Sequence, residues 1–316
     1  MDQRNCPHLF IVGNVNLDLI MGPLDSWPDR GTEVFLGNTH WRVGGCAGNT
    51  AIALGALDSP YTLIANRGND LMGTWLESHF SNNAKLAHFN GGTSVTVGIT
   101  HSDNERTFLS GAGNVENLTL DDVLSQLPKR AGKGDIVLLC SAFLTTALLP
   151  KYQDLVRELK HRGFTLAIDT GWPPQGWDTL RHEVLQWLSD IDYILLNELE
   201  VCELSGKKEL LSAIDFLRER CTQTATIIVK QGGNGASAYG DNLEHHCPAP
   251  NVNVIDTIGA GDTFNTGFLY ALQQGKNLSQ ALHWGIQLAS HTISTSPRTF
   301  LDRETFLTAL EGAQHG

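Results

Sequence analysis

Short apolar runs alternate along this chain with amphipathic stretches, and this alternation restricts the possible fold more than any other feature. Six runs have the length of a strand and are bounded by polar or turn-forming residues, as strands buried on both faces are. Residues 49–57, 148–162 and 213–221 have instead the apolar spacing of helices. The repeated alternation predicts an α/β fold, a parallel sheet with helices on both faces. The predicted strands are residues 9–13, 61–65, 135–140, 164–169, 192–197 and 225–230.

Two segments depart from this alternation. Residues 15–42 and 92–110 alternate with a period of two and contain hairpin-like polar breaks such as HSDNER. We expect them to form a small antiparallel sheet inserted into the core. Both segments leave the core at ends of predicted strands, where α/β proteins bind ligands, so the small sheet is predicted to be a lid. Two surface hairpins without a role are the alternative. Because no linker or internal repeat is visible, residues 1–316 are predicted to form one domain.

Charge and cysteine content limit the partners and the location. The 316 residues carry 22 basic and 34 acidic side chains, a formal net charge of -12, which disfavours binding to nucleic acid or to anionic membranes. A site for an anionic ligand must therefore be built locally. The six cysteines form no C-x-x-C pair, which indicates free thiols in a reducing compartment. The apolar run LFIVG is too short for a signal peptide or a membrane span, so a cytoplasmic location is expected.

The stretch DTIGAGDTFNTGF at residues 256–268 gives the strongest indication of chemistry. It follows the strand-like NVNVID, and its apolar spacing predicts a helix that stops near Gly275. Unpaired N–H groups of the first helical turn can stabilise developing negative charge, as an anion hole does. The Asp262 carboxylate would repel a phosphate bound there, so its presence needs a reason. A base must lie close to the hydroxyl that attacks the phosphorus, so Asp262 is the candidate general base. A helix-capping aspartate is the alternative. The predicted anion hole consists of Gly259, Ala260 and Gly261.

This stretch closely resembles the C-terminal signature of the ribokinase/PfkB family of carbohydrate and nucleoside kinases, in which the G-A-G-D unit supplies the anion hole and the base. Other family motifs occur in the same order along most of the chain. They are GNVNLDLI (13–20), GGCAGNTAIALGAL (44–57), NELE (197–200) and VKQGGNGA (229–236). Each motif alone would be a weak indication, whereas their order and spacing together are specific. The resemblance implies a ribokinase-like three-layer α/β sandwich with a mostly parallel central sheet and a small β lid.

The resemblance also implies the reaction and the residues that bind its ligands. The γ-phosphoryl group of ATP would pass to a primary hydroxyl of a sugar or sugar-like substrate, with Mg²⁺ as a cofactor and Asp262 as the base. The implied substrate contacts are Asn16, Asp18, Gly44, Gly45 and Asn49, and the implied nucleotide contacts are Asn197, Gly232 and Gly235.

Metal ions and a second copy of the chain complete what the resemblance implies. Glu200 would reach Mg²⁺ through water, because Mg²⁺ prefers to keep several waters. The backbone carbonyls of Asp256 and Ile258 would bind a monovalent cation, K⁺, which would order the turn of the anion hole. The exposed edge of the lid would pair with a second copy of the chain, as in dimeric relatives.

Three other functions remain open at this point. A nucleoside kinase on the same fold, with Phe143 and Trp172 as an apolar wall for the base, is the first alternative. A sugar- or nucleotide-binding regulator without activity is disfavoured by the intact G-A-G-D unit. A dehydrogenase is indicated only by a lone G-x-G-x-x-A pattern at residues 233–238, and the P-loop motif of another kinase class does not occur.

Overall fold

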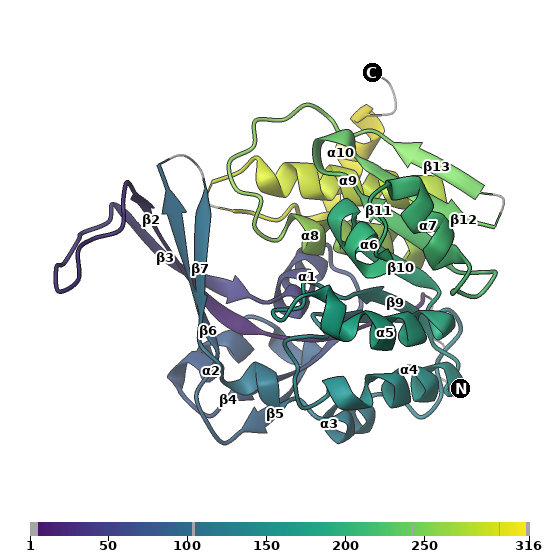
Figure 1. Ribbon diagram of the computed structural model, residues 1–316, viewed down its shortest axis with the longest axis horizontal. Helices are drawn as coiled ribbons and strands as arrows, with labels where there is room; N and C mark the ends of the chain where they lie inside the picture. Colours follow the sequence, from purple (N-terminus) through teal and green to yellow (C-terminus); the bar gives the residue numbers. More distant parts are fainter. Residues whose placement is uncertain (1–5, 103–104, 242, 297, 314–316) are drawn as a thin grey trace.

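The computed structural model describes residues 6–102, 105–241, 243–296 and 298–313, so that the ends of the predicted domain and residues 103–104 of the predicted lid lie outside it. Its centre is a nine-stranded sheet (Figure 1). Neighbouring strands are parallel except for the pairs that involve β12. The order is β13 (Leu243–Cys247), β12 (Ala236–Gly240), β11 (Thr226–Lys230), β10 (Tyr193–Asn197), β9 (Thr165–Asp169), β8 (Ile136–Cys140), β1 (Leu9–Val12), β4 (Tyr61–Gly68) and β5 (Ala84–Phe89).

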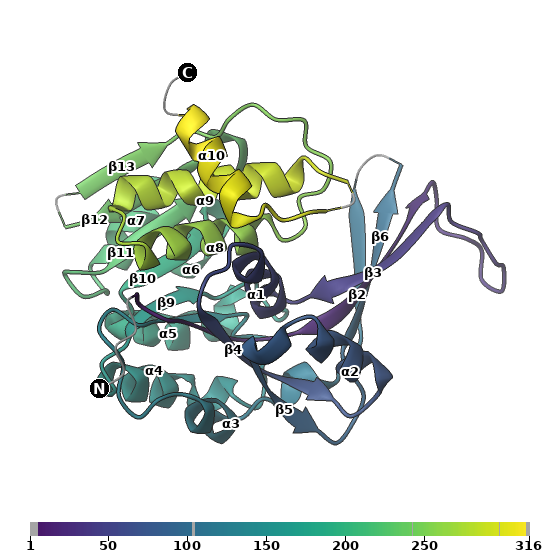
Figure 2. The same ribbon diagram turned by 180° about the vertical axis from the view of Figure 1, so that it is seen from behind.

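Helices cover both faces of this sheet, because its central strands are apolar on both sides. In β1, Leu9 and Ile11 pack into one core cluster, whereas Phe10 and Val12 pack into the other. No helix in the described ranges is long and apolar enough to cross a membrane. The first cluster includes α1 (Cys46–Ala56), α2 (Leu71–Ser78), α8 (Ala260–Gln273), α9 (Leu278–Ile293) and α10 (Arg303–Ala313), and the second includes α3 (Leu120–Gln126), α4 (Tyr152–His161), α5 (Trp177–Trp187), α6 (Glu198–Ser205) and α7 (Leu210–Arg218) (Figures 1 and 2).

A second sheet of four strands stands at one side of this body (Figures 1 and 2). Two antiparallel pairs build this lid sheet, one from each predicted segment, and β2 and β6 join them. The joining pair is parallel, so the prediction of an antiparallel sheet was wrong at this position, which the sequence pattern of single strands does not determine. The order is β3 (Asn38–Gly44), β2 (Asn16–Leu24), β6 (Val95–His101) and β7 (Arg106–Ser110).

The α/β class with a mostly parallel sheet and a small β lid is therefore confirmed, and all six predicted core strands are present to within a few residues. One predicted strand is wrong. Residues 251–256, NVNVID, form no strand but a partly exposed loop. Its alternating apolar side chains Val252 and Val254 line a cavity instead of a sheet surface. The predicted helix after the glycines is α8, and Gly275 follows its end with φ +71°.

Candidate active site

The turn before α8 is built as an anion-binding turn requires. Gly259 precedes the first helical residue with φ 79° and ψ 9°, a left-handed conformation that favours glycine, and no side chain caps the helix. A Cβ atom on Gly259 would lie 2.7 Å from Nη1 of Arg298. The N–H of Ala260 donates to the carbonyl of Thr257 at 3.1 Å. The Ala260 N–H of the predicted anion hole is therefore already hydrogen-bonded within the turn. Ala260 and Gly261 both line the cavity described below.

Asp262 lies in the first turn of α8 and is 8% exposed. Its Oδ2 accepts a hydrogen bond of 2.7 Å from Nδ2 of Asn49, which α1 brings in from the other end of the chain. Burial raises the pKa of Asp262, and the Asn49 hydrogen bond opposes this by favouring the carboxylate. A carboxylate with a raised pKa is a better proton acceptor than an exposed aspartate, as a general base must be.

The predicted substrate contacts of β2 and β3 lie together beside Asn49. Nδ2 of Asn16 donates to Oδ1 of Asp18 at 2.8 Å, and both side chains are buried. Gly44 is opposite Asn16 in the β2–β3 pair, and a Cβ atom on Gly44 would overlap the carboxylate of the nearby Asp18. Gly45 turns into α1 with φ 83°. Burial raises the pKa of Asp18, and the Arg42 guanidinium opposes this. Glycine at these positions thus lets a carboxylate lie directly on the backbone.

A cavity of about 240 Å³ opens between the lid sheet and the core. Asn16 is the predicted substrate residue that lines it, and Asp18 lies next to it through the Asn16 bond. Phe143 forms part of the apolar side of this cavity, whereas Trp172 does not line it and is 48% exposed. The polar side is formed by Asn14, Asn16, Ser94, Thr96, Ser110, Glu116, Thr146 and Gln175.

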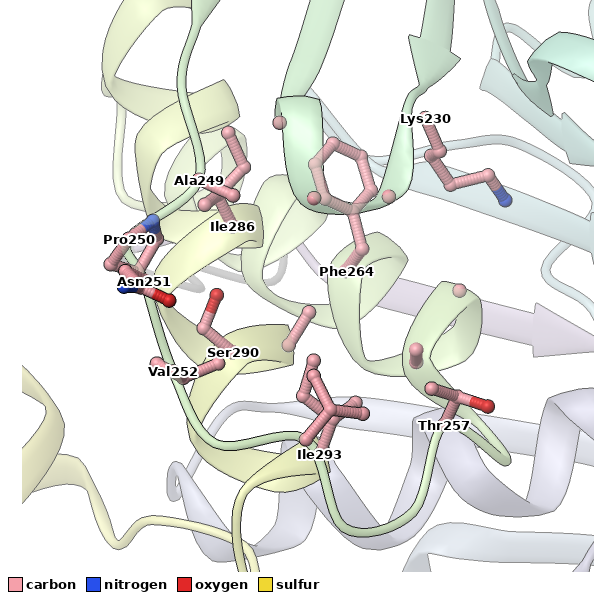
Figure 3. A pocket seen from close by; sticks show the side chains of 17 residues that line it. Lys230, Ala249, Pro250, Asn251, Val252, Thr257, Phe264, Ile286, Ser290 and Ile293 are labelled. Atoms are coloured by element: carbon pink, nitrogen blue, oxygen red, sulfur yellow. The ribbon is translucent and has the colours of Figure 1, made fainter. Parts of the chain in front are cut away.

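A larger cavity of about 640 Å³ lies beside the start of α8 (Figure 3). Gly232 and Gly235 of the β11–β12 connection line it together with the start of α8, so two of the predicted nucleotide contacts and part of the predicted anion hole share one cavity. Figure 3 shows Phe264 between the Ala249–Val252 loop on one side and Lys230 with Thr257 on the other. Most of the lining side chains are apolar or glycine, which suits the flat face of a heterocycle.

Asn197 and Glu200 do not line this cavity. They form a capping box at the start of α6, in which Oδ1 of Asn197 accepts from the Glu200 N–H and Oε2 of Glu200 accepts from the Asn197 N–H, each at 2.8 Å. Burial raises the pKa of Glu200, and the nearby Asp169 raises it further. Two buried carboxylates close together make a position at which a cation is favourable.

Three residues of this region were missed by the sequence reasoning. Nζ of Lys230, at the end of β11, donates to Oδ2 of Asp169 at 2.7 Å, and Nδ2 of Asn265 in α8 donates to the same oxygen at 2.6 Å. Burial lowers the pKa of Lys230, but Asp169 and Glu200 outweigh it, so the pKa is raised overall. The available signal was positional, since Asp169 and Lys230 end the parallel strands β9 and β11 on either side of β10, at the edge where ligands of α/β proteins bind.

Three arginines contact the turn before α8. Arg42 of β3 and Arg106 of β7 both pair with Asp256, at 3.0 and 3.3 Å, and Arg106 also donates to Thr257 at 3.1 Å. Arg298 donates to the carbonyl of Ile258 at 3.2 Å. Burial tends to raise the pKa of Asp256, but hydrogen bonds from the Ile258 N–H and from Arg42 hold it below its usual value. No group of three or more His, Cys, Asp or Glu side chains with the arrangement of a metal site is found in the part of the chain that the structure describes.

The chain is similar to known proteins both in sequence and in fold. The sequence pattern of the pfkB family of carbohydrate kinases matches residues 7–301. A ribokinase of Lactococcus lactis is 25% identical over 287 residues, which cover 89% of this chain and 88% of that protein. In fold, the chain matches Arabidopsis thaliana ribokinase in complex with ribose and ATP (TM-score 0.77, 21% identity, 97% and 99% of the two chains) and adenosine kinase of Sinorhizobium meliloti (TM-score 0.79, 19% identity, 98% and 100%). The ribokinase-like architecture is thereby confirmed, and the chain belongs to the pfkB family of carbohydrate kinases.

Proposed function

We propose that the protein transfers the γ-phosphoryl group of ATP to a primary hydroxyl of a sugar or sugar-like substrate, with Asp262 as the general base. One observation carries this proposal. The buried Asp262 carboxylate lies in the first turn of α8, where Gly261 lines the 640 Å³ cavity, and it accepts a hydrogen bond from Asn49, which is itself a predicted substrate contact. Asp262 directly follows Gly261 of this cavity lining, so a substrate hydroxyl beside its carboxylate would lie close to a phosphoryl group held at the start of α8, as in-line transfer requires.

The chain's own groups would divide the work as follows. ATP would occupy the 640 Å³ cavity with its heterocycle against Phe264 and the Ala249–Val252 loop, and its phosphates would reach the start of α8. The N–H groups of Gly259 and Gly261, with the positive end of the helix dipole, would stabilise the charge of the transferring group. Asp262 would take the proton from the substrate hydroxyl, and closure of the lid sheet would exclude water.

The residues around Glu200 fit Mg²⁺ bound through water. The pKa of this buried carboxylate is raised by burial and by Asp169, so a dication nearby would be stabilised. Glu200 and Asp169 would hold the ion, which would supply neutralising charge to the phosphates of ATP. Lys230, already bonded to Asp169, would add one further positive charge beside the same cavity.

The cleft under the lid sheet favours a sugar over a nucleoside as the substrate. Eight of its fourteen lining residues carry amide, hydroxyl or carboxylate groups, which bond sugar hydroxyls as donors and acceptors. The nucleoside kinase remains the alternative, because Phe143 and Leu144 give the cleft one apolar side on which a base could stack.

The test is a phosphorylation assay with ATP and Mg²⁺ across a panel of sugars and nucleosides. The turnover number of Asp262→Asn is then measured with the acceptor that the wild type phosphorylates best. Loss of a general base lowers the turnover number by roughly 10²–10⁴. Asp122→Asn, in an exposed capping box of α3, is the matched control and should leave turnover unchanged. Normal turnover by Asp262→Asn would remove this residue from the mechanism, and tight binding without transfer for every acceptor would favour a regulator.

Two coarser properties complete the proposal. We infer a homodimer through the lid sheet, because Trp41, Phe108 and Leu109 on it are each at least half exposed. We infer a cytoplasmic location, because all six cysteines are free thiols. Sedimentation of the wild type against Phe108→Ser tests the first inference, and cell fractionation tests the second.

A further inference from the structure

The turn before α8 does not fit the monovalent cation that the family resemblance implies. Its predicted ligands are the carbonyls of Asp256 and Ile258, and guanidinium groups already contact both residues. The Asp256 carboxylate pairs with Arg42 and Arg106, and the Ile258 carbonyl accepts from Arg298. A further cation here would meet three fixed positive charges, and Coulomb repulsion would oppose its binding.

Arg298 connects three segments that are far apart in the sequence. Besides the Ile258 carbonyl, its guanidinium donates to the carbonyl of Val43 at 3.4 Å and to Oδ1 of Asn49 at 3.0 Å. The three acceptors belong to the turn before α8, the end of β3 and the first turns of α1. The planar guanidinium has five donors in a fixed arrangement, so one side chain can hold several acceptors in place, as a coordinated cation does.

The same contact determines how the Asn49 amide is oriented. Oδ1 of Asn49 faces Arg298 and Nδ2 faces Asp262. The opposite orientation would place the NH₂ group against a guanidinium and the oxygen against a carboxylate, so it would lose both hydrogen bonds. Arg298 therefore ensures that Asn49 donates to Asp262.

We propose that Arg298 is a positioning residue that replaces a monovalent cation: its guanidinium holds the turn of the anion hole and directs the Asn49 amide toward Asp262, so that turnover does not require K⁺. The proposal rests on the proposed function for the role of Asp262. Burial and the neighbouring Arg42 lower the pKa of Arg298 to about 10, so the group is charged at neutral pH.

The first test needs no variant. The turnover number of the wild type is measured in KCl, NaCl and tetramethylammonium chloride at equal ionic strength, and equal values are expected. Thermal unfolding in the same three salts, without substrates, repeats the test independently of catalysis. A turnover number that rises several-fold with K⁺, or a Tm raised by K⁺ alone, overturns the proposal. Absence of phosphoryl transfer in every salt would instead refute the proposed function, and the Tm comparison would still decide the cation question.

The second test removes the guanidinium. Arg298→Ala loses all three hydrogen bonds of the guanidinium, including the one that orients Asn49 toward Asp262, and we expect kcat to fall about 10- to 100-fold. Guanidinium chloride at millimolar concentration should restore part of the lost kcat of Arg298→Ala. Arg298→Lys keeps the positive charge but not the planar set of donors, so its kcat should lie between those of Arg298→Ala and the wild type. Arg162→Ala is the matched control, because Arg162 likewise donates through Nη1 to three acceptors, all of them backbone carbonyls, but lies at the end of α4. It should lower Tm without affecting kcat.

The pH profile distinguishes positioning from general stability. Without Arg298, the base loses a nearby positive charge and the fixed orientation of Asn49, so the acidic limb of kcat/KM should move to higher pH. An unmoved limb together with unchanged kcat in folded Arg298→Ala contradicts the proposal, and should that variant not fold, Arg298→Lys supplies the same readout. The titratable or charged groups that act on Asp262 are Cys46, Cys140, Asp169, Lys230 and Arg298, and each is retained in the Arg162→Ala control.

Discussion

Asn49→Ala tests the electrostatic setting of the proposed base directly. In the wild type, Nδ2 of Asn49 donates to Oδ2 of Asp262 at 2.7 Å, and this bond favours the ionised carboxylate against the effect of burial. A hydrogen bond to a charged group contributes about 1.5–3 kcal/mol, which corresponds to about 1–2 pKa units. The variant should therefore raise the pKa of Asp262 by that amount. Arg298 keeps its carbonyl partners Ile258 and Val43, so the turn before α8 should persist.

The assay is the pH dependence of kcat/KM, whose acidic limb reports the base of the free enzyme. Because only the carboxylate accepts the proton, a higher pKa moves this limb to higher pH by about 1–2 units, and kcat/KM below the limb falls about tenfold for each unit. Asn14→Ala is the control, since the Asn14 side chain bonds Asn16 and the Cys46 N–H at the start of α1 but not Asp262. It should lower kcat/KM at every pH. A limb that stays in place in Asn49→Ala, or moves to lower pH, refutes the assigned role of this bond.

Two further predictions concern the larger cavity. Gly235→Ala should lower Tm and weaken ATP binding measured by calorimetry. A left-handed conformation (φ +97°) costs about 1–2 kcal/mol for other residues, and the new Cβ would overlap the Cys247 carbonyl. A Cβ on Gly232 would meet open space, so Gly232→Ala should have the smaller effect. Lys230→Met leaves the buried Asp169 without its positively charged partner and should lower the free energy of unfolding in urea by about 3–5 kcal/mol, and adding Asp169→Asn should recover part of this loss. Equal stability of the Lys230 variant and the wild type would contradict the assigned importance of the pair.

Much of the core was predictable from the sequence because each buried strand is apolar on both faces. The run 135–140 became β8 and the run 225–230 became β11 for this reason. The residues 251–256 show the limit of the same rule. Their alternation is that of a strand, but no neighbouring strand pairs with them, and their apolar side chains face a cavity. Likewise, the pattern of β2 and β6 determines which side chains share a face but not whether the two strands run parallel.

Part of the candidate site could be predicted because the local backbone conformation of a turn determines where glycine is needed. Gly259 precedes α8 in a left-handed conformation, and this geometry follows from adjacent residues. The contribution of Arg298 has no local cause. Its acceptors on Val43 and Asn49 are about 250 positions away, and only the folded chain brings them together. The same is true of Asp169, whose partners Lys230 and Asn265 lie 61 and 96 positions away.

The bonds from Arg106 to Asp256 and Thr257 join β7 directly to the turn before α8. Moving the lid sheet outward would break these contacts at the very segment that presents the proposed anion hole. Thermodynamic linkage is reciprocal, so a ligand that steadies this turn also shifts the conformational equilibrium of the sheet toward the inward position by the same free energy. Nucleotide and acceptor would therefore bind cooperatively, although the two cavities share none of their lining residues.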